Sequence, residues 1–258
     1  MDWKRWGLVC LLFLLLWIWQ EMPDGKLRLI FCDVGQGDGA VVVFGYFQAV
    51  VDTGAYEDKI LNCLGQHIPF WDKRIEIVFL SHPDKDHVGA IGGIKKHYKI
   101  GKLVDKAIVG DRFLYQNLYF DVVKGSENNV TFPMEGSSIS NESSIVLEMI
   151  YKDFSVLFTG DIDMENEKAL MTSGLLGEVD ILKVAHHGSK YSSADEFLRK
   201  INPKFAIISV GKKNTYGHPA PEVLERLLGV GAKALRTDEL GTIEAVFDSK
   251  NLRWQVKR

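Results

Sequence analysis

The sequence has little cysteine, little proline and no strong excess of charge of either sign. Its 258 residues include three cysteines and seven prolines, and 31 basic against 34 acidic residues leave a formal net charge of −3. Cys10, Cys32 and Cys63 show no CxxC or other zinc spacing, so we expect small buried residues rather than a disulfide framework. Because there is no global basic field, a polyanionic substrate must be held by local features, of which metal ions are the most obvious.

Proline- or glycine-rich linkers and internal repeats are also absent from residues 25–258, which predicts a single domain there. An apolar fraction of 46% and a charged fraction of 25% exclude a disordered chain. Both values are typical of a globular protein with one large core or two layered ones.

The longest apolar run lies at the N-terminus. Residues Trp6 to Trp19 carry no charge, Lys4 and Arg5 precede them, and tryptophans stand at both ends of the run. The run is shorter than the roughly 20 residues of a spanning helix, and no small-x-small cleavage site follows it. We interpret residues 1–24 as an uncleaved signal anchor that leaves the rest of the chain outside the cytoplasm. A cleaved signal of a secreted protein and a soluble role are the alternatives.

Short β-branched and aromatic runs recur from Lys26 onward in both halves of the chain, with helical patterns between them. Since strands cluster at the front of each half and helices follow, the pattern predicts two sheets packed face to face with helices outside, an α/β/β/α sandwich. The polar segment 125–142 is expected to contain a hairpin and a loop near one rim. The expected helices cover residues 58–67, 88–98, 164–171, 194–201 and 221–228.

Five of the seven histidines fall into three short segments, each of which follows a strand-like run. The segments are Ser81–His87 (SHPDKDH), His186–Ser189 and Gly217–Pro219. Side chains at the carboxyl end of a strand are held by a rigid sheet and face a cleft, as a metal site requires. The other two, His67 and His97, lie on helical stretches without ligand spacing, and we interpret them as structural or surface residues.

The HxDxDH spacing predicts ligands for two adjacent cations. Four ligand-type side chains within six positions cannot all point one way, so His82 and Asp84 can serve one ion while Asp86 and His87 serve the other. Asp161, in a Thr-Gly-Asp turn after an apolar strand, is the natural bridging carboxylate, because its two oxygens can bind two cations.

The remaining histidines suggest further roles. Adjacent residues of an extended chain point to opposite sides, so only one of His186 and His187 is expected to be a ligand. We favour His186, with His187 facing the substrate or a supporting partner. His218 lies in a loop whose Asn214 and Tyr216 can bind a phosphate or protonate a leaving group.

Six motifs follow one another along the chain: DVGQGD (33–38), VDTG (51–54), SHPDKDH (81–87), LFTGD (157–161), AHHGS (185–189) and YGHP (216–219). In this order they resemble the metallo-β-lactamase-fold domain at the end of ComEC, the DNA-uptake channel of competent bacteria. The similarity covers roughly residues 25 to 250, after the expected N-terminal hydrophobic helix. It implies a four-layer αββα metallo-β-lactamase sandwich with two divalent metal ions, zinc or manganese, that activate water to hydrolyse a phosphodiester.

The resemblance also implies positions for further residues. Asp52 supports the metal site from behind its ligands, Gln36 and Asp38 lie on a loop at the rim of the cleft, and Ser189 of the AHHGS motif contacts substrate or supports a ligand. Two departures affect the metals. The family often has histidine in place of Asp84 and a further histidine ligand near residues 141–144, where Asn141 is a poorer ligand, so one site can be weak or hold a hard ion such as manganese.

The expected function is a metal-dependent phosphodiesterase or nuclease that acts on DNA or another phosphodiester outside the cytoplasm. Asp86, His187 and His218 are the expected catalytic residues, and His187 or His218 protonates the leaving oxygen. The expected partners are the substrate, a membrane through the N-terminal helix, and the DNA-uptake machinery. With at most one membrane span, the chain cannot itself be the channel.

Two other functions stay open: hydrolysis of a different bond, such as a lactone, β-lactam or thioester, and ligand binding by a catalytically decayed site. DNA is favoured only by the resemblance, because no basic stripe with interleaved aromatics marks a nucleic-acid groove. The lysines near the HxDxDH motif fit a solvated helix face; they are Lys95, Lys96, Lys99 and Lys102.

Overall fold

A computed structural model describes residues 3–20, 22–126, 143–248 and 251–257. Asn141 and most of the segment in which we expect a hairpin and loop therefore lie outside the described residues.

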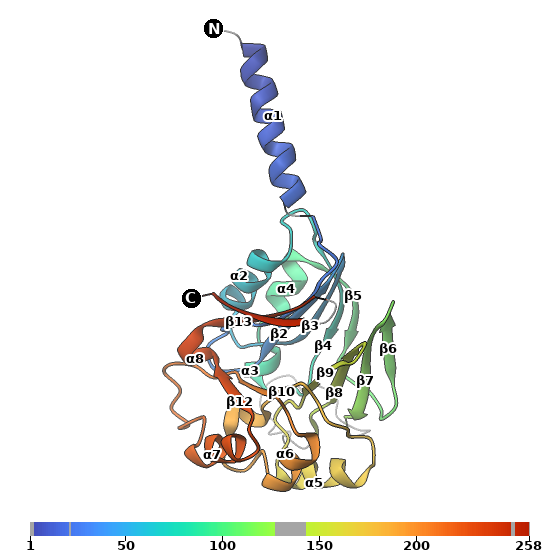
Figure 1. Cartoon of the computed structure of the whole chain (residues 1–258), viewed down its shortest axis with the longest axis vertical. Coiled ribbons are helices and arrows are strands. Elements are labelled where there is room, and N and C mark those ends of the chain that lie inside the picture. Colours follow the sequence, from blue (N-terminus) through green and yellow to red (C-terminus); the bar gives the residue numbers. More distant parts are fainter. Residues whose placement is uncertain (1–2, 21, 127–142, 249–250, 258) are drawn as a thin grey trace.

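The chain folds into two seven-stranded sheets that pack face to face, as the strand pattern predicted (Figure 1). The first has the order β14-β13-β1-β2-β3-β4-β5 and the second β12-β11-β10-β9-β8-β7-β6. Both are mixed, because β3 to β5 are parallel in the first sheet and β9 to β12 in the second. The strands of the first sheet are β1 Leu27–Phe31, β2 Gly39–Phe44, β3 Phe47–Thr53, β4 Arg74–Phe79, β5 Lys99–Val104, β13 Thr242–Asp248 and β14 Asn251–Lys257. Those of the second are β6 Arg112–Tyr115, β7 Leu118–Lys124, β8 Val146–Tyr151, β9 Phe154–Phe158, β10 Ile181–Lys183, β11 Phe205–Ile208 and β12 Lys233–Arg236.

The central strands are apolar on both faces because both faces are covered. In β2, Ala40 and Val42 pack into the core between the sheets, whereas Val41 and Val43 pack under the helices outside. Such strands are continuous apolar runs rather than alternating ones.

Helices cover the outer face of each sheet. On the first sheet, α2 (Glu57–His67) and α4 (Ile91–His97) bury Ile60, Leu64 and Ile94 against the strands. On the second, α5 (Met164–Thr172), α6 (Asp195–Ile201) and α7 (Pro221–Gly229) share an apolar cluster with the strands. Of these helices, α2, α5, α6 and α7 match predicted helices within a few residues.

The fifth predicted helix, 88–98, is wrong in its extent. The structure has a short helix α3, Lys85–Val88, then Gly89 and Ala90, and only then α4. A Cβ on Gly89 would lie 2.5 Å from the Lys85 carbonyl oxygen and 3.0 Å from that of Ala55, so the chain passes too close to the segment after β3 for a larger residue. Apolar periodicity does not report such an approach. The short helix α8, Thr237–Leu240, was not predicted.

The N-terminal apolar run forms helix α1, Trp3–Gln20, which projects from the rest of the molecule at the end where β1 begins (Figure 1). Trp3, Trp6 and Phe13 are exposed along it. In the part of the chain that the structure describes, no helix has the length and apolarity needed to cross a membrane.

Cys32 and Cys63 form a disulfide, so the expectation that they are merely small buried residues was wrong. Cys32 follows β1, Cys63 lies 31 residues later on α2, and their Cα atoms are 5.9 Å apart. Sequence spacing could not show this pair, because the packing of α2 on the sheet sets that distance. Disulfides persist in oxidising compartments, so the pair suggests an extracytoplasmic location.

Candidate metal centre

The candidate site lies where the carboxyl ends of strands from both sheets meet. Asp52 is near the end of β3, and the SHPDKDH motif follows β4 in the same sheet. In the second sheet Asp161 follows β9, and the two adjacent histidines follow β10. Because neighbouring parallel strands end at one edge, segments far apart in sequence converge there.

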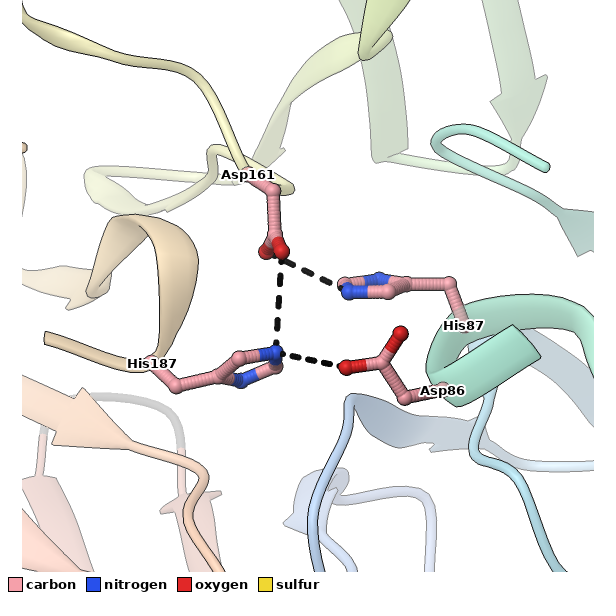
Figure 2. A group of neighbouring side chains, drawn as sticks. All are labelled: Asp86, His87, Asp161 and His187. Atoms are coloured by element: carbon pink, nitrogen blue, oxygen red, sulfur yellow. Dashed lines mark hydrogen bonds and ion pairs between the residues drawn. The ribbon is translucent and has the colours of Figure 1, made fainter. Parts of the chain in front are cut away.

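Four side chains, two from each half of the sandwich, form the centre of the site (Figure 2). His87 Nε2 lies 3.2 Å from one oxygen of Asp161, and His187 Nε2 lies 3.6 Å from the other. His187 Nε2 is also 3.2 Å from Asp86 Oδ2. All but Asp86 are buried.

Three more of the predicted ligands lie around Asp161. His82 Nε2 is 3.9 Å from Asp161 Oδ2 and 3.6 Å from Asp84 Oδ2, and His186 Nε2 is 4.0 Å from Asp161 Oδ2. Asp161 thus faces four histidines: His87 is near one of its oxygens, and His82, His186 and His187 are near the other. Both oxygens have metal-ligand-type neighbours, as the predicted bridging role requires.

Opposite charges dominate the centre. Burial alone would raise the pKa of Asp161, but His87 and His187 more than offset it and hold that pKa well below its ordinary value. Burial lowers the pKa of His187, yet Asp161 and Asp38 raise it to about 9. The pKa of His87 is likewise raised, by Asp161 and Asp52 against the effect of burial. The carboxylates are therefore ionised and concentrated at one point.

The donor atoms fit a divalent metal ion. Among the described atoms, His82 Nε2 is buried without a hydrogen-bond partner, which is costly unless something else binds it. His87 Nε2 and Asp161 Oδ1 are also buried, and they form only the 3.2 Å ion pair with each other. Two donors each about 2.1 Å from one ion in a tetrahedral site are about 3.4 Å apart. The separations of 3.2 to 4.0 Å around Asp161 are close to that value. Histidine and carboxylate donors suit zinc or manganese.

Asp52 and Ser81 orient two of these histidines from behind. Asp52 accepts hydrogen bonds from the backbone N–H of Ser81 at 2.8 Å and from its hydroxyl at 2.7 Å, and Asp52 Oδ2 lies 2.9 Å from His87 Nδ1. The Ser81 hydroxyl is 3.0 Å from His82 Nδ1. With Nδ1 engaged, Nε2 of both rings faces the centre, the usual arrangement behind metal-binding histidines. Sequence reasoning placed Asp52 here but missed Ser81, whose only signal was its position directly before His82.

Asp38 is not at the rim of the cleft, where we expected it, but buried behind the centre. Its side chain pairs with the buried ammonium of Lys183 and lies 3.2 Å from His187 Nδ1, while its backbone N–H donates to the Asp86 carbonyl. A Cβ on Gly37 would lie 2.1 Å from that same carbonyl oxygen, so the loop abuts Asp86 and carries Asp38 inward. Lys183 was not singled out from the sequence as part of the site. The signal that could have found it was a single lysine within the otherwise apolar stretch ILKVA, which indicates a buried charge.

The argument from an extended chain at His186 and His187 was wrong. Both residues are left-handed, with φ of 49° and 54°, in a 3₁₀ turn after β10. His187 is buried, with Nδ1 3.0 Å from the Ser209 carbonyl oxygen, whereas the His186 side chain is 30% exposed. The geometry therefore favours His187 over His186 as a ligand.

A pocket of about 220 Å³ opens over the centre. His218 forms part of its wall, with its ring 5.7 Å from that of His186. Burial and the nearby His186 lower the pKa of His218. The pocket is lined by Gln36, Asp84, Asp86, Asp161, His186, His187, Tyr216 and His218.

Two predicted substrate contacts do not face this pocket. The Asn214 amide braces its own loop, donating to the carbonyl groups of Gly211 and His218 and accepting from the His218 N–H. Ser189 is buried, and its hydroxyl oxygen lies 3.4 Å from the backbone nitrogen of Tyr191. Asn214 thus supports the loop that carries the pocket residues Tyr216 and His218.

Comparisons with known proteins agree with this geometry. Residues 34–112 match the family model of the metallo-beta-lactamase superfamily. The chain is 31% identical to ComE operon protein 3 of Bacillus subtilis, over 95% of this chain and 36% of that protein. It is 28% identical to competence protein ComA of Neisseria gonorrhoeae, over 87% of this chain and 33% of that protein. The chain thus spans about a third of the length of these relatives.

The solved structures show the fold. The metallo-beta-lactamase fold protein YhfI from Bacillus subtilis superposes with a TM-score of 0.59 at 10% identity, covering 86% of this chain and all of YhfI. The chain is therefore a metallo-β-lactamase-fold protein, homologous over nearly all of its own length to ComE operon protein 3 and competence protein ComA.

Proposed function

We propose that this protein is a metal-dependent phosphodiesterase or nuclease that acts on DNA or another phosphodiester outside the cytoplasm. The observation that carries the proposal is Asp161, which faces four histidines and lines an open pocket. The homology to a competence protein supports DNA as the substrate. The disulfide supports a location outside the cytoplasm.

The residues around the pocket have different roles in the proposed reaction. Two divalent cations, when bound by His82, Asp84, Asp86, His87, Asp161 and His187, supply a Lewis acid and lower the pKa of water. Both ring nitrogens of His187 are engaged, one near Ser209 and the other near Asp86, so it is a poor proton donor. His218, on the pocket wall, is then the residue that, in its protonated form, donates a proton to the leaving oxygen as its bond to phosphorus breaks. His186 beside it binds substrate or completes the metal site.

The test is hydrolysis of bis-p-nitrophenyl phosphate and of single- and double-stranded DNA by the purified chain, with manganese or zinc added and bound metal quantified. We expect metal-dependent cleavage that Asp161→Ala abolishes while the circular dichroism spectrum is unchanged. Asp153→Ala, an exposed aspartate in the turn before β9, is the matched control and should keep full turnover.

The outcomes separate the candidate functions. Full turnover by Asp161→Ala would exclude the bridging role. Bound metal without phosphodiester cleavage would favour a lactone, β-lactam or thioester as substrate, and absence of both metal and turnover would favour a binding protein.

Two further parts of the hypothesis concern location. Attachment to a membrane through residues 1–24 and an association with the DNA-uptake machinery stay predictions. Protease protection in intact cells tests the first: digestion of residues after 25 by external protease is expected, and protection would exclude the orientation.

A further inference from the structure

The pocket loop, residues 211–218, lies between β11 and α7 in the sequence. Two of its residues, Tyr216 and His218, line the pocket at the candidate metal centre. Its shape is fixed from within by Asn214, which bonds to the backbone at both ends of the loop. It is fixed from outside by Gly211, whose N–H donates to Gln36 Oε1 at 3.3 Å. A Cβ at Gly211 would lie 2.8 Å from the Gln36 backbone nitrogen, so the loop is seated closely on its neighbour. Side chains on this loop are therefore presented in a defined place.

Tyr216 is the aromatic residue of this loop, and it is 71% exposed. Its ring lies nearly parallel to that of His218, at 17° and 5.9 Å between centroids, and both rings line the pocket. The His218 ring in turn contacts that of His186. A line of rings thus runs from the candidate metal centre to solvent, ending in a large aromatic face at the pocket mouth. Such a face binds flat, unpaired π-systems.

Lys212 and Lys213 give the same loop two positive charges. Both are exposed, and among the residues that the structure describes neither ammonium group has an ion-pair partner. The two lysines precede the pocket residues Tyr216 and His218 on the same loop and do not themselves line the pocket. Because the whole chain is slightly acidic, these lysines are local cations of the kind a polyanion needs.

We propose that the pocket loop binds the nucleotides next to the scissile phosphate, with Tyr216 stacked on a base and Lys212 and Lys213 contacting flanking phosphates. The preferred substrate is then a single-stranded polynucleotide, because a base must be unpaired to stack. A polymer of phosphodiesters without bases would miss the Tyr216 contact. This inference rests on the proposed phosphodiesterase function and adds the class of substrate.

The first experiment compares a single-stranded oligonucleotide with the same backbone made of abasic units, using the full chain with manganese. We expect Tyr216→Ala to raise KM for the normal oligonucleotide about 10-fold or more, since stacking on one aromatic residue has an effect of that order. KM for the abasic strand should be unchanged. Tyr216→Phe keeps the ring and should behave as the wild type. Tyr46→Ala removes an exposed tyrosine in the β2–β3 turn and is the control.

The second experiment measures how KM for the normal oligonucleotide depends on salt. Replacing Lys212 and Lys213 together by alanine removes two phosphate contacts. The steepness of the plot of log(1/KM) against log salt concentration should therefore fall by about 1.4. The matched control is the double alanine variant at Lys95 and Lys96, an adjacent exposed pair on α4. Its slope should stay that of the wild type.

The results distinguish this inference from the function on which it rests. If the wild type cleaves both strands equally well, or if Tyr216→Ala affects both alike, base stacking by Tyr216 is excluded while the phosphodiesterase stands. An unchanged salt slope in the Lys212 and Lys213 variant excludes the phosphate contacts. If the wild type with metal cleaves neither bis-p-nitrophenyl phosphate nor any oligonucleotide, the proposed function itself fails.

Discussion

At the scale of single residues, the most informative side chain is Lys183, because it is a buried charge behind a centre made of other charges. Its ammonium pairs with Asp38, which contacts His187 through its side chain and Asp86 through its backbone. The pair thus connects a strand of the second sheet to a loop of the first. The same ammonium supplies the positive charge beside the buried group of Asp38, Asp52 and His87, which has the spacing of a metal site.

Lys183→Met should therefore be strongly destabilising. It leaves the buried Asp38 carboxylate with only the His187 ring beside it, and removing one partner of a buried ion pair typically costs about 3–5 kcal/mol. Loss of support behind His187 should also weaken metal binding about 10- to 100-fold. Urea unfolding and metal titration against a chelator measure the two effects.

Two further variants separate charge from position. The double variant Asp38→Asn with Lys183→Met removes both charges and should regain stability but not metal affinity. Lys204→Met breaks the exposed pair with Asp180 and should change stability by less than about 1 kcal/mol. If Lys183→Met were as mild as Lys204→Met, the buried pair would have no special role.

At the scale of elements, Glu167 joins α5 to the segment that enters α6. It is fully buried and accepts hydrogen bonds from the backbone N–H groups of Ser193 and Ala194. Burial raises its pKa from 4.5 to about 7, although the two N–H groups and Arg226 act in the opposite direction. The folded protein therefore holds a proton at Glu167 that the unfolded chain has released at the same pH.

The sign of the pH dependence follows from that difference. Between about pH 4.5 and 7 the folded state binds more protons, so this residue's contribution to the free energy of unfolding falls as pH rises, by an amount on the order of 3 kcal/mol. Glu167→Gln should remove this part of the slope in unfolding measured at a series of pH values, whatever its effect on absolute stability. Glu165→Gln, on the exposed side of α5, should leave the slope intact. Equal slopes in the wild type and Glu167→Gln would contradict the assignment.

The Cys32–Cys63 disulfide ties the end of β1 to α2 and stands directly before the loop that carries Gln36 and Asp38. Closing a loop of 31 residues restricts the unfolded chain and should stabilise the protein by about 3–4 kcal/mol. Replacing both cysteines by alanine should lower the urea midpoint accordingly. The wild type in strong reductant provides the comparison without the small cavities that alanine leaves, and Cys10→Ser, at a free exposed cysteine, should have no effect. Equal midpoints for the oxidised and reduced wild type would argue against the bond.

At the scale of the whole molecule, a metal ion bound at this centre links the two sheets, since its candidate ligands come from both. An ion that binds only the folded state and is present at a free concentration of 100 times its Kd stabilises that state by about 2.7 kcal/mol. For a chain of this size, such a stabilisation raises Tm by about 5–10 °C. Manganese or zinc should produce that shift in scanning calorimetry and a chelator should reverse it. Asp161→Ala should abolish most of the shift. A full shift in that variant would mean that the ions bind elsewhere.

The sequence predicted the layers, because apolar runs and helical periodicity indicate which segments are strands and helices. It also singled out residues that the fold brings together: Asp86 and His87 of the HxDxDH motif form one cluster with Asp161 and His187, and Asp52 lies 2.9 Å from His87 Nδ1. Their roles as ligands stay predictions. What it could not predict depends on contacts across the fold. The disulfide, the Asp38–Lys183 pair, the break at Gly89 and the left-handed turn at His186 are set by distances between segments or by backbone conformation, which periodicity does not carry.

The pairing of β1 with β13 has a consequence for how the protein is made. Leu27 lies opposite Phe247 in this antiparallel pair, so two strands that are far apart in the sequence are neighbours in the first sheet. During synthesis, β1 has an open edge until residues 242–248 emerge. The nascent chain therefore carries an unpaired strand edge throughout that interval, and so should need shielding from other nascent chains until β13 is made.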